Sequence, residues 1–166
     1  SPTESTTYTV TARGAGGAAE ATARITVTVP PPPLPPPPSP PPPPAPSLQE
    51  QFDRAVRDAF FDYDKSDIRP DGRDALTSSA EFLRANPNAM IRLEGDCDER
   101  GSIEYNLGLG DSRANSAKDF LVSLGISSER MTTISYGKER PFCTESNEDC
   151  WQQNRRAHLV CTNCGP

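Results

Sequence analysis

The segment EGDCDERG, residues 94–101, places several charged side chains where an apolar, alternating stretch of the chain ends. Asp98 lies in this segment, and Arg113 follows it fifteen positions later, within a helical pattern. A guanidinium binds a carboxylate through two parallel hydrogen bonds, and an aspartate accepts N–H donors from an ammonium. An exposed Asp98–Arg113 pair that faces a shared cleft therefore indicates a site for a zwitterionic ligand. The competing interpretation is a surface ion pair between the two residues, which contributes little to stability.

Calcium binding is the first alternative, because the segment FDYDKSDIRPDGRD, which starts at Phe61, is rich in aspartate. A calcium loop of the EF-hand type needs glycine at its sixth position and glutamate at its twelfth. Counted from Asp62, those positions hold Asp67 and Arg73. The spacing therefore argues against a calcium site.

Nucleophilic catalysis is the second alternative, with Cys97 as nucleophile, His158 as base and Asp98 as the group that orients the base. His158 lies between Ala157 and Leu159 in a strand-like stretch, where a single histidine is more often structural. No glycine motif that could stabilise an oxyanion accompanies Cys97. We therefore predict no catalytic residue and no cofactor.

Five cysteines, at positions 97, 143, 150, 161 and 164, bear on the compartment of the protein. Cys143 and Cys150 flank the polar stretch TESNED, which indicates a disulfide and an oxidising compartment. Cys161 and Cys164 form a C-x-x-C pair, but a structural zinc site usually needs a second pair or two histidines, and this chain has one histidine. We predict no metal site, leave the bonding of this pair open, and expect Cys97 to be a buried free thiol.

Composition excludes two further classes of function. The formal net charge of −6 disfavours a nucleic-acid partner on electrostatic grounds. No apolar run approaches the roughly 20 residues of a membrane-spanning helix.

The chain divides into three predicted parts. Residues 1–29 alternate threonine with apolar residues on either side of GAGG, which predicts a β-hairpin that resembles the last two strands of a bacterial immunoglobulin-like repeat; the alternative is an unfolded arm. Residues 30–46 hold fourteen prolines in seventeen positions, which predicts a polyproline II spacer of roughly 50 Å. A docking site for a proline-binding domain is the less favoured reading of that segment. Residues 47–166 form the main domain.

Hydrophobic periodicity predicts the elements of the main domain. A short amphipathic helical stretch begins near Ser47, and a helix carries Leu76, Ala80 and Leu83 on one face until Asn86-Pro87 ends it. A second helix carries Ala114, Ala117, Leu121 and Leu124 and ends at Gly125. Strands are predicted at residues 59–63, 90–95, 131–136 and 156–160. The order is β-α-β-α-β-loop-β, an α/β sandwich with helices on one face of a mixed sheet.

Four ordered motifs, FDYDKSDIRPDG, EGDCDERGSIEYNLGLGDSRA, ISYGKERP and NRRAHLV, resemble the OmpA-like C-terminal domain family. The resemblance covers about residues 47–161 and is strongest to the branch of peptidoglycan-associated lipoproteins. It implies a noncatalytic periplasmic module that binds peptidoglycan. In that family the ligand is the meso-diaminopimelate of uncrosslinked stem peptides, whose free end is zwitterionic.

The four motifs indicate which residues of this sequence correspond to the ligand-binding residues of the family. Asp98 of DERG would hold the ammonium group of diaminopimelate, and Arg113 would hold a carboxylate. The resemblance further places Tyr63 and Asp64 in the cleft, Arg100 and Leu109 at its border, and Asn154 and Arg155 at its far wall. For Leu109 the alternative is a place in the core, and for Arg155 it is an ion pair with an acid such as Asp58.

One residue sets this chain apart from the family pattern, and a cysteine pair links it to a subset of the family. Asp96 stands where the family usually has histidine, so a second carboxylate either strengthens ammonium binding or raises the pKa of one of the two acids. Cys143 and Cys150 look like a pair that is disulfide-bonded in a subset of the family.

The resemblance also implies where the protein works and with what. We expect a periplasmic protein that associates with the outer membrane through an N-terminal region outside this sequence, and that tethers the membrane or a surface protein to the cell wall. Its expected partners are peptidoglycan and a TolB-like protein. The alternative function is a protein–protein interaction module of a Tol-Pal-like envelope complex in which peptidoglycan binding is lost or secondary.

Overall fold

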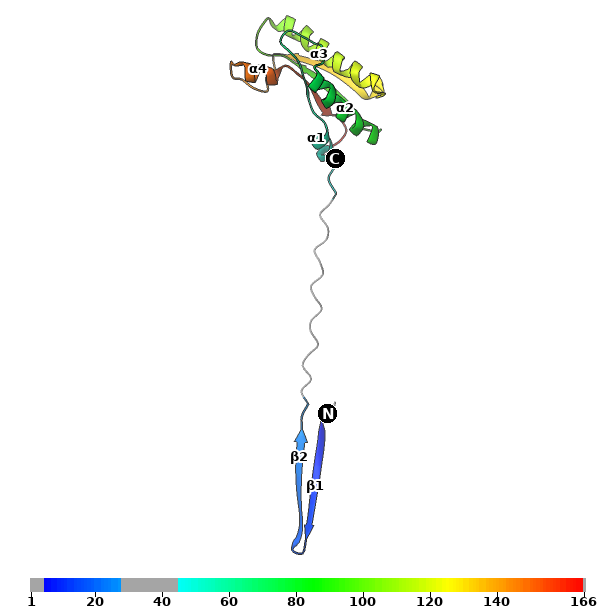
Figure 1. The fold of residues 1–166 in the computed structure, drawn as a ribbon, viewed down its shortest axis with the longest axis vertical. Coiled ribbons are helices and arrows are strands. Elements are labelled where there is room, and N and C mark those ends of the chain that lie inside the picture. The colour runs from blue at the N-terminus through cyan, green and yellow to red at the C-terminus, as the bar shows by residue number, and fades with distance from the viewer. Residues whose placement is uncertain (1–4, 28–44, 166) are drawn as a thin grey trace. The chain divides into compact units, whose positions relative to one another are not determined.

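A computed structural model describes residues 5–27 and 45–165, which form two separate units (Figure 1). Nearly all of the predicted polyproline spacer, residues 30–46, lies outside the described residues. Within the described ranges, no helix combines the length and the apolar character that crossing a membrane requires.

The first unit is a β-hairpin within the range 1–29. Strand β1 (Thr6–Gly14) pairs antiparallel with β2 (Gly17–Ile25), in register from Thr6 opposite Ile25 to Gly14 opposite Gly17. Gly17 has a φ of 132°, a conformation that favours glycine and allows the tight reversal. Tyr8, Val10 and their cross-strand alanines share one face of the hairpin, and threonines and charged residues share the other.

The second unit has four helices and a four-stranded mixed sheet. Its elements are α1 (Leu48–Ala55), β3 (Ala59–Phe60), α2 (Pro70–Ala85), β4 (Ile91–Asp96), α3 (Ile103–Ser123), β5 (Met131–Gly137), α4 (Glu148–Asn154) and β6 (Arg156–Cys161). The strand order is β3-β6-β4-β5, with β4 and β5 parallel and the other pairs antiparallel. The predicted α/β fold with a mixed sheet is confirmed.

The helices of this unit start and stop where the sequence provides caps. In α1, Ser47 and Glu50 form a reciprocal capping box. Helix α2 begins at Pro70, where proline's missing N–H has no cost, and it ends before Asn86. Helix α3 begins after Ser102, whose hydroxyl accepts a hydrogen bond from the backbone N–H of Tyr105.

Two predicted elements differ from the observed ones. The first strand covers residues 59–60 instead of 59–63, because the chain turns after Phe61, where the Lys65 N–H bonds back to the Asp62 carbonyl. The predicted loop before the last strand contains α4, whose sequence EDCWQQN has no apolar stripe to indicate a helix. Asn147 caps α4 by accepting a hydrogen bond from the Cys150 N–H.

The core lies between the sheet and the pair α2 and α3, which pack side by side (Figure 1). Ile91 and Leu93 of β4 are buried against this helical layer. Helix α3 sits so close to β4 that a methyl group on Gly95 would lie 1.8 Å from the carbonyl oxygen of Gly110. One helical turn after Gly110, this close approach brings Arg113 to the carboxyl end of β4.

Candidate functional site

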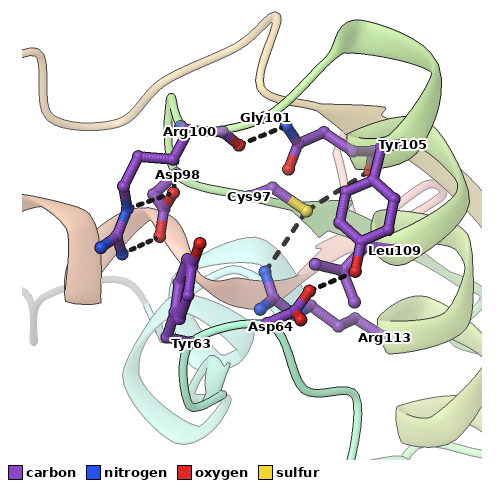
Figure 2. A pocket seen from close by; sticks show the side chains of 10 residues that line it. Tyr63, Asp64, Cys97, Asp98, Arg100, Gly101, Tyr105, Leu109 and Arg113 are labelled. Carbon is purple, nitrogen blue, oxygen red and sulfur yellow. Dashed lines mark hydrogen bonds and ion pairs between the residues drawn. The ribbon is translucent and has the colours of Figure 1, made fainter.

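A pocket opens beyond the carboxyl end of β4 and encloses about 300 Å³, part of it open to solvent (Figure 2). Three segments build it: the turn after β3, the loop that follows β4, and the first turns of α3. Six of the eight predicted site residues line it, namely Tyr63, Asp64, Asp98, Arg100, Leu109 and Arg113. The pocket is therefore the place where the charge pair inferred from spacing comes together.

Arg113 forms the floor of the pocket and is only 1% exposed. Its guanidinium donates to three backbone carbonyls, those of Lys65 at 2.9 Å, Asp96 at 2.9 Å and Asp62 at 3.1 Å, and to the Cys97 sulfur at 3.3 Å. Burial lowers the pKa of Arg113, although a guanidinium stays charged in proteins. None of the ion pairs among residues 5–27 and 45–165 involves Arg113. It is a buried cation held by dipoles, with one of its roughly five N–H donors left over.

Asp98 lies across the pocket and is also buried, at 4% exposed. It accepts hydrogen bonds from the backbone N–H and the guanidinium of Arg100, and from Nη1 of Arg155 at 3.1 Å. Burial alone would raise the pKa of Asp98, but the hydrogen bonds from the two arginines outweigh it and hold this pKa below its ordinary value. Asp98 is therefore an anion at neutral pH.

The observed pair differs from the prediction in its burial. Asp98 and Arg113 were expected to be exposed, but both are buried, because the close packing of α3 on β4 encloses them. The alternative of an ion pair between them is not realised, since Asp98 pairs with Arg100 and Arg155 instead.

The Arg100 guanidinium contacts two aromatic rings. Its guanidinium carbon is 4.0 Å from the ring centre of Tyr63 and 4.2 Å from that of Trp151, distances typical of cation–π contacts. Figure 2 shows Arg100, Asp98 and Tyr63 gathered on one side of the pocket, and Arg113, Tyr105 and Leu109 on the other.

Asp64 occupies a left-handed backbone conformation, with a φ of 56°, which aspartate tolerates better than most residues. Its carboxylate accepts a short hydrogen bond from the Tyr105 hydroxyl. This contact ties the turn after β3 to α3, and it raises the pKa of Tyr105. The exposed Asp64 is thus a second carboxylate at the rim of the pocket.

Asn154 and Arg155 do not line the pocket, contrary to their predicted place at its far wall. The Asn154 side chain bonds to the backbone N–H groups of Phe142 and Cys143 and to the Cys143 carbonyl, so it holds the disulfide loop. Arg155 lies behind Asp98 and pairs with Glu148. The acid Asp58, suggested for Arg155, pairs with Arg156 and His158.

Four residues of the pocket were not predicted: Cys97, Gly101, Tyr105 and Asn106. The Asn106 amide donates to the carbonyls of Arg100 and Ser102 and so fixes the loop after β4. Tyr105 and Asn106 lie in the quoted motif EGDCDERGSIEYN, and their position in the first turn of a helix beside the charged loop is the signal that could have identified them.

The cysteines and the histidine do not form a catalytic group. Cys97 is buried and free, as predicted, and burial raises the pKa of its thiol to about 11, so the thiolate is scarce at neutral pH. His158 pairs with Asp58 on the opposite side of the sheet from α3. Cys143 is bonded to Cys150, as predicted, and Cys161 to Cys164. Within the described part of the chain, no three side chains of the metal-binding types cluster.

Comparisons with known proteins identify the family. The OmpA family profile matches residues 60–155. The peptidoglycan-associated lipoprotein of Brucella suis is 48% identical over 106 residues, which cover 64% of this chain and 63% of that protein. The corresponding protein of Agrobacterium fabrum is 47% identical over 118 residues, with 70% of this chain and 67% of that protein covered.

The chain thus spans about 63% of the length of the first curated relatives that it matches. Among solved structures, the peptidoglycan-associated lipoprotein from Burkholderia pseudomallei superposes with a TM-score of 0.62 at 38% identity, and covers 64% of this chain and 91% of that one. The C-terminal domain of Helicobacter pylori MotB, at 16% identity and a TM-score of 0.60, shares the fold. The match over residues 60–155, more than half of the sequence, shows that the chain belongs to the OmpA family.

Proposed function

We propose that residues 47–166 form a noncatalytic domain that binds peptidoglycan through the meso-diaminopimelate of its stem peptides. The observation that carries this proposal is Arg113, a buried guanidinium without a carboxylate partner among the described residues, at the floor of a pocket that also holds Asp98 and Asp64. A buried charge without a counterion is costly, and a ligand carboxylate would relieve that cost. The names of the relatives, peptidoglycan-associated lipoproteins, agree with this ligand.

The free end of the diaminopimelate side chain carries an ammonium and a carboxylate on one carbon atom. Its carboxylate would pair with the remaining N–H donor of Arg113, and its ammonium would pair with the Asp98 carboxylate in place of a present partner, with Asp64 nearby at the rim. Charge-assisted hydrogen bonds of this kind are worth about 1.5–3 kcal/mol each. Two opposite charges at a fixed separation select a zwitterion over a simple amine or acid.

Binding without bond cleavage is the role that the pocket supports. The Cys97 thiol is neutral and already engaged with Arg113 and Asn106, and His158 lies on another face of the sheet. The protein then acts as a tether that holds an outer-membrane or surface element to the cell wall from the periplasm. A TolB-like partner, and outer-membrane association through a region beyond this sequence, are further parts of the proposal.

Isothermal titration of the full chain with two matched muropeptides tests the function. One ends in meso-diaminopimelate, and the other carries L-lysine, which keeps the amine but lacks the side-chain carboxylate. We expect saturable binding of the first and at least roughly tenfold weaker binding of the second, because the Arg113 contact is lost.

The Arg113→Lys variant should reduce this preference, because lysine cannot reproduce the guanidinium's set of bonds to three carbonyls. Asp64→Asn, at an exposed position of the rim, serves as a second variant. A folded wild-type protein that binds neither muropeptide, or binds both equally, would refute the proposed function.

A further inference from the structure

We propose that Arg100 is an internal competitor for Asp98: its guanidinium occupies the carboxylate acceptors that a ligand's ammonium needs, and ligand binding displaces it. This inference rests on the proposed function and adds that binding is an exchange of one cation for another. Arg100 then sets the affinity of the pocket and its selectivity for a free ammonium group.

The acceptors of Asp98 are fully used in the structure. A carboxylate offers about four acceptor positions. Oδ1 accepts from the Arg100 backbone N–H and from Arg100 Nε, both at 3.1 Å, and Oδ2 accepts from Arg100 Nη2 at 2.7 Å and from Arg155 Nη1 at 3.1 Å. An incoming ammonium therefore cannot bind Asp98 unless one guanidinium leaves.

Of the two guanidinium groups, Arg100 is the one that can leave. The Arg155 side chain is only 3% exposed. Besides Asp98, its guanidinium donates hydrogen bonds to Glu148, Gln152 and the Phe61 carbonyl. The Arg100 side chain is 31% exposed, and Asp98 is the only residue to which its guanidinium donates a hydrogen bond among the described residues. Among the described residues, the guanidinium otherwise contacts the rings of Tyr63 and Trp151 and lies 4.0 Å from the Glu148 carboxylate, and none of these contacts is a hydrogen bond.

A place for the displaced guanidinium already exists. The carboxylate of Glu148 is 64% exposed and lies 4.0 Å from Arg100 Nη2, so a small outward movement would bring the two into closer contact. When Arg100 leaves, Asp98 loses a positively charged partner. Only a ligand that carries its own positive charge replaces that partner. An amide nitrogen, such as the one formed when a stem peptide is crosslinked, brings no charge and should not displace Arg100.

The test compares two variants by calorimetric titration of the full chain. Arg100→Met keeps a stem of similar length between the rings but removes the charge. Arg69→Met is the matched control, because the Arg69 side chain is 32% exposed, pairs with a carboxylate through two hydrogen bonds, and lies outside the pocket. The two variants thus lose the same charge at the same degree of exposure.

The probes are the muropeptide that ends in meso-diaminopimelate and the same muropeptide with its side-chain ammonium acetylated. We expect Arg100→Met to bind the free-ammonium probe roughly three- to thirtyfold more tightly than wild type, and the acetylated probe no better. Arg69→Met should match wild type for both. Arg100→Lys, which keeps the charge but not the guanidinium fork, should fall between wild type and Arg100→Met, and it remains informative if Arg100→Met does not fold.

Trp151 gives an independent readout, because it is the only tryptophan in the chain and it contacts Arg100. The free-ammonium probe should change Trp151 fluorescence in wild type and leave it nearly unchanged in Arg100→Met. If wild type binds and Arg100→Met binds equally or more weakly, Arg100 is not a competitor, and the proposed function stands without this inference. If neither binds either probe, the proposed function and the inference fail together.

Discussion

We expect Asp96 to give the protein an unusual dependence of stability on pH. The residue is 5% exposed, Oδ2 accepts one hydrogen bond at 3.3 Å from Arg156, and Oδ1 has no partner among the described residues. Burial raises the pKa of Asp96 from 3.8 to about 6; Arg156 opposes this rise and Glu94 adds to it. Of the two outcomes expected for a second acid here, the structure therefore favours the raised pKa.

The direction of the effect follows from proton binding. Unfolded Asp96 loses its proton near pH 3.8 and folded Asp96 near pH 6, so between these values the unfolded chain binds fewer protons. Stability then falls as the pH rises through this window. A difference of about two pH units at 1.36 kcal/mol each amounts to roughly 3 kcal/mol. Asp96→Asn removes this titration, so the variant should gain stability relative to wild type by up to about 3 kcal/mol between pH 4 and pH 7.

Urea denaturation of wild type and Asp96→Asn, followed by Trp151 fluorescence from pH 4 to pH 8, measures this difference. The informative quantity is the difference in unfolding free energy between the two proteins, because all other titratable groups are present in both and their contributions largely cancel. Asp119→Asn, at an exposed position, controls for the loss of one negative charge. A difference in unfolding free energy that stays constant from pH 4 to pH 7, or that shrinks, would show that Asp96 is not held in a costly ionised state.

Other consequences of the structure are open to direct measurement. Gly95→Ala would place a methyl group 1.8 Å from a backbone oxygen of α3, so we expect a loss of about 2 kcal/mol or more in unfolding free energy, measured by urea denaturation. Replacing Cys143 and Cys150 by serine opens a short loop and should cost about 2 kcal/mol in the same assay, with the circular dichroism of the domain retained. The pKa of His158 should lie above its ordinary value because of its hydrogen bond with Asp58, and Asp58→Asn should lower it in an NMR titration.

Periodicity was sufficient to predict most of the fold. Helix α2 has Leu76 and Leu83 on one face and proline residues at or near both ends, and β4 alternates over its whole length, so these elements follow from local sequence. Helix α4 did not follow, because its seven residues have no apolar stripe and its position depends on the Asn147 cap and a disulfide.

The residues of the candidate site could be predicted in part from sequence, but their burial could not. The spacing of Asp98 and Arg113 places both at the end of β4, and the motifs add Tyr63, Asp64, Arg100 and Leu109, all of which line the pocket. Burial could not be read from spacing, because it depends on how closely α3 approaches β4. The role of Arg155 was also beyond local sequence, since it reaches Asp98 from a position 57 residues later.

The two buried charges of the pocket, Arg113 and Asp98, have opposite kinds of surroundings. This difference determines how ligand binding is coupled to the stability of the free protein. Arg113 is surrounded by carbonyl dipoles and has no counterion among the described residues, so its site is ready for an anion and its burial costs stability in the free protein. Asp98 has two guanidinium partners, so its site is stable in the free protein and must be vacated for a cation. A ligand carboxylate should therefore supply most of the net affinity, while the ammonium, which only exchanges with Arg100, should supply most of the selectivity.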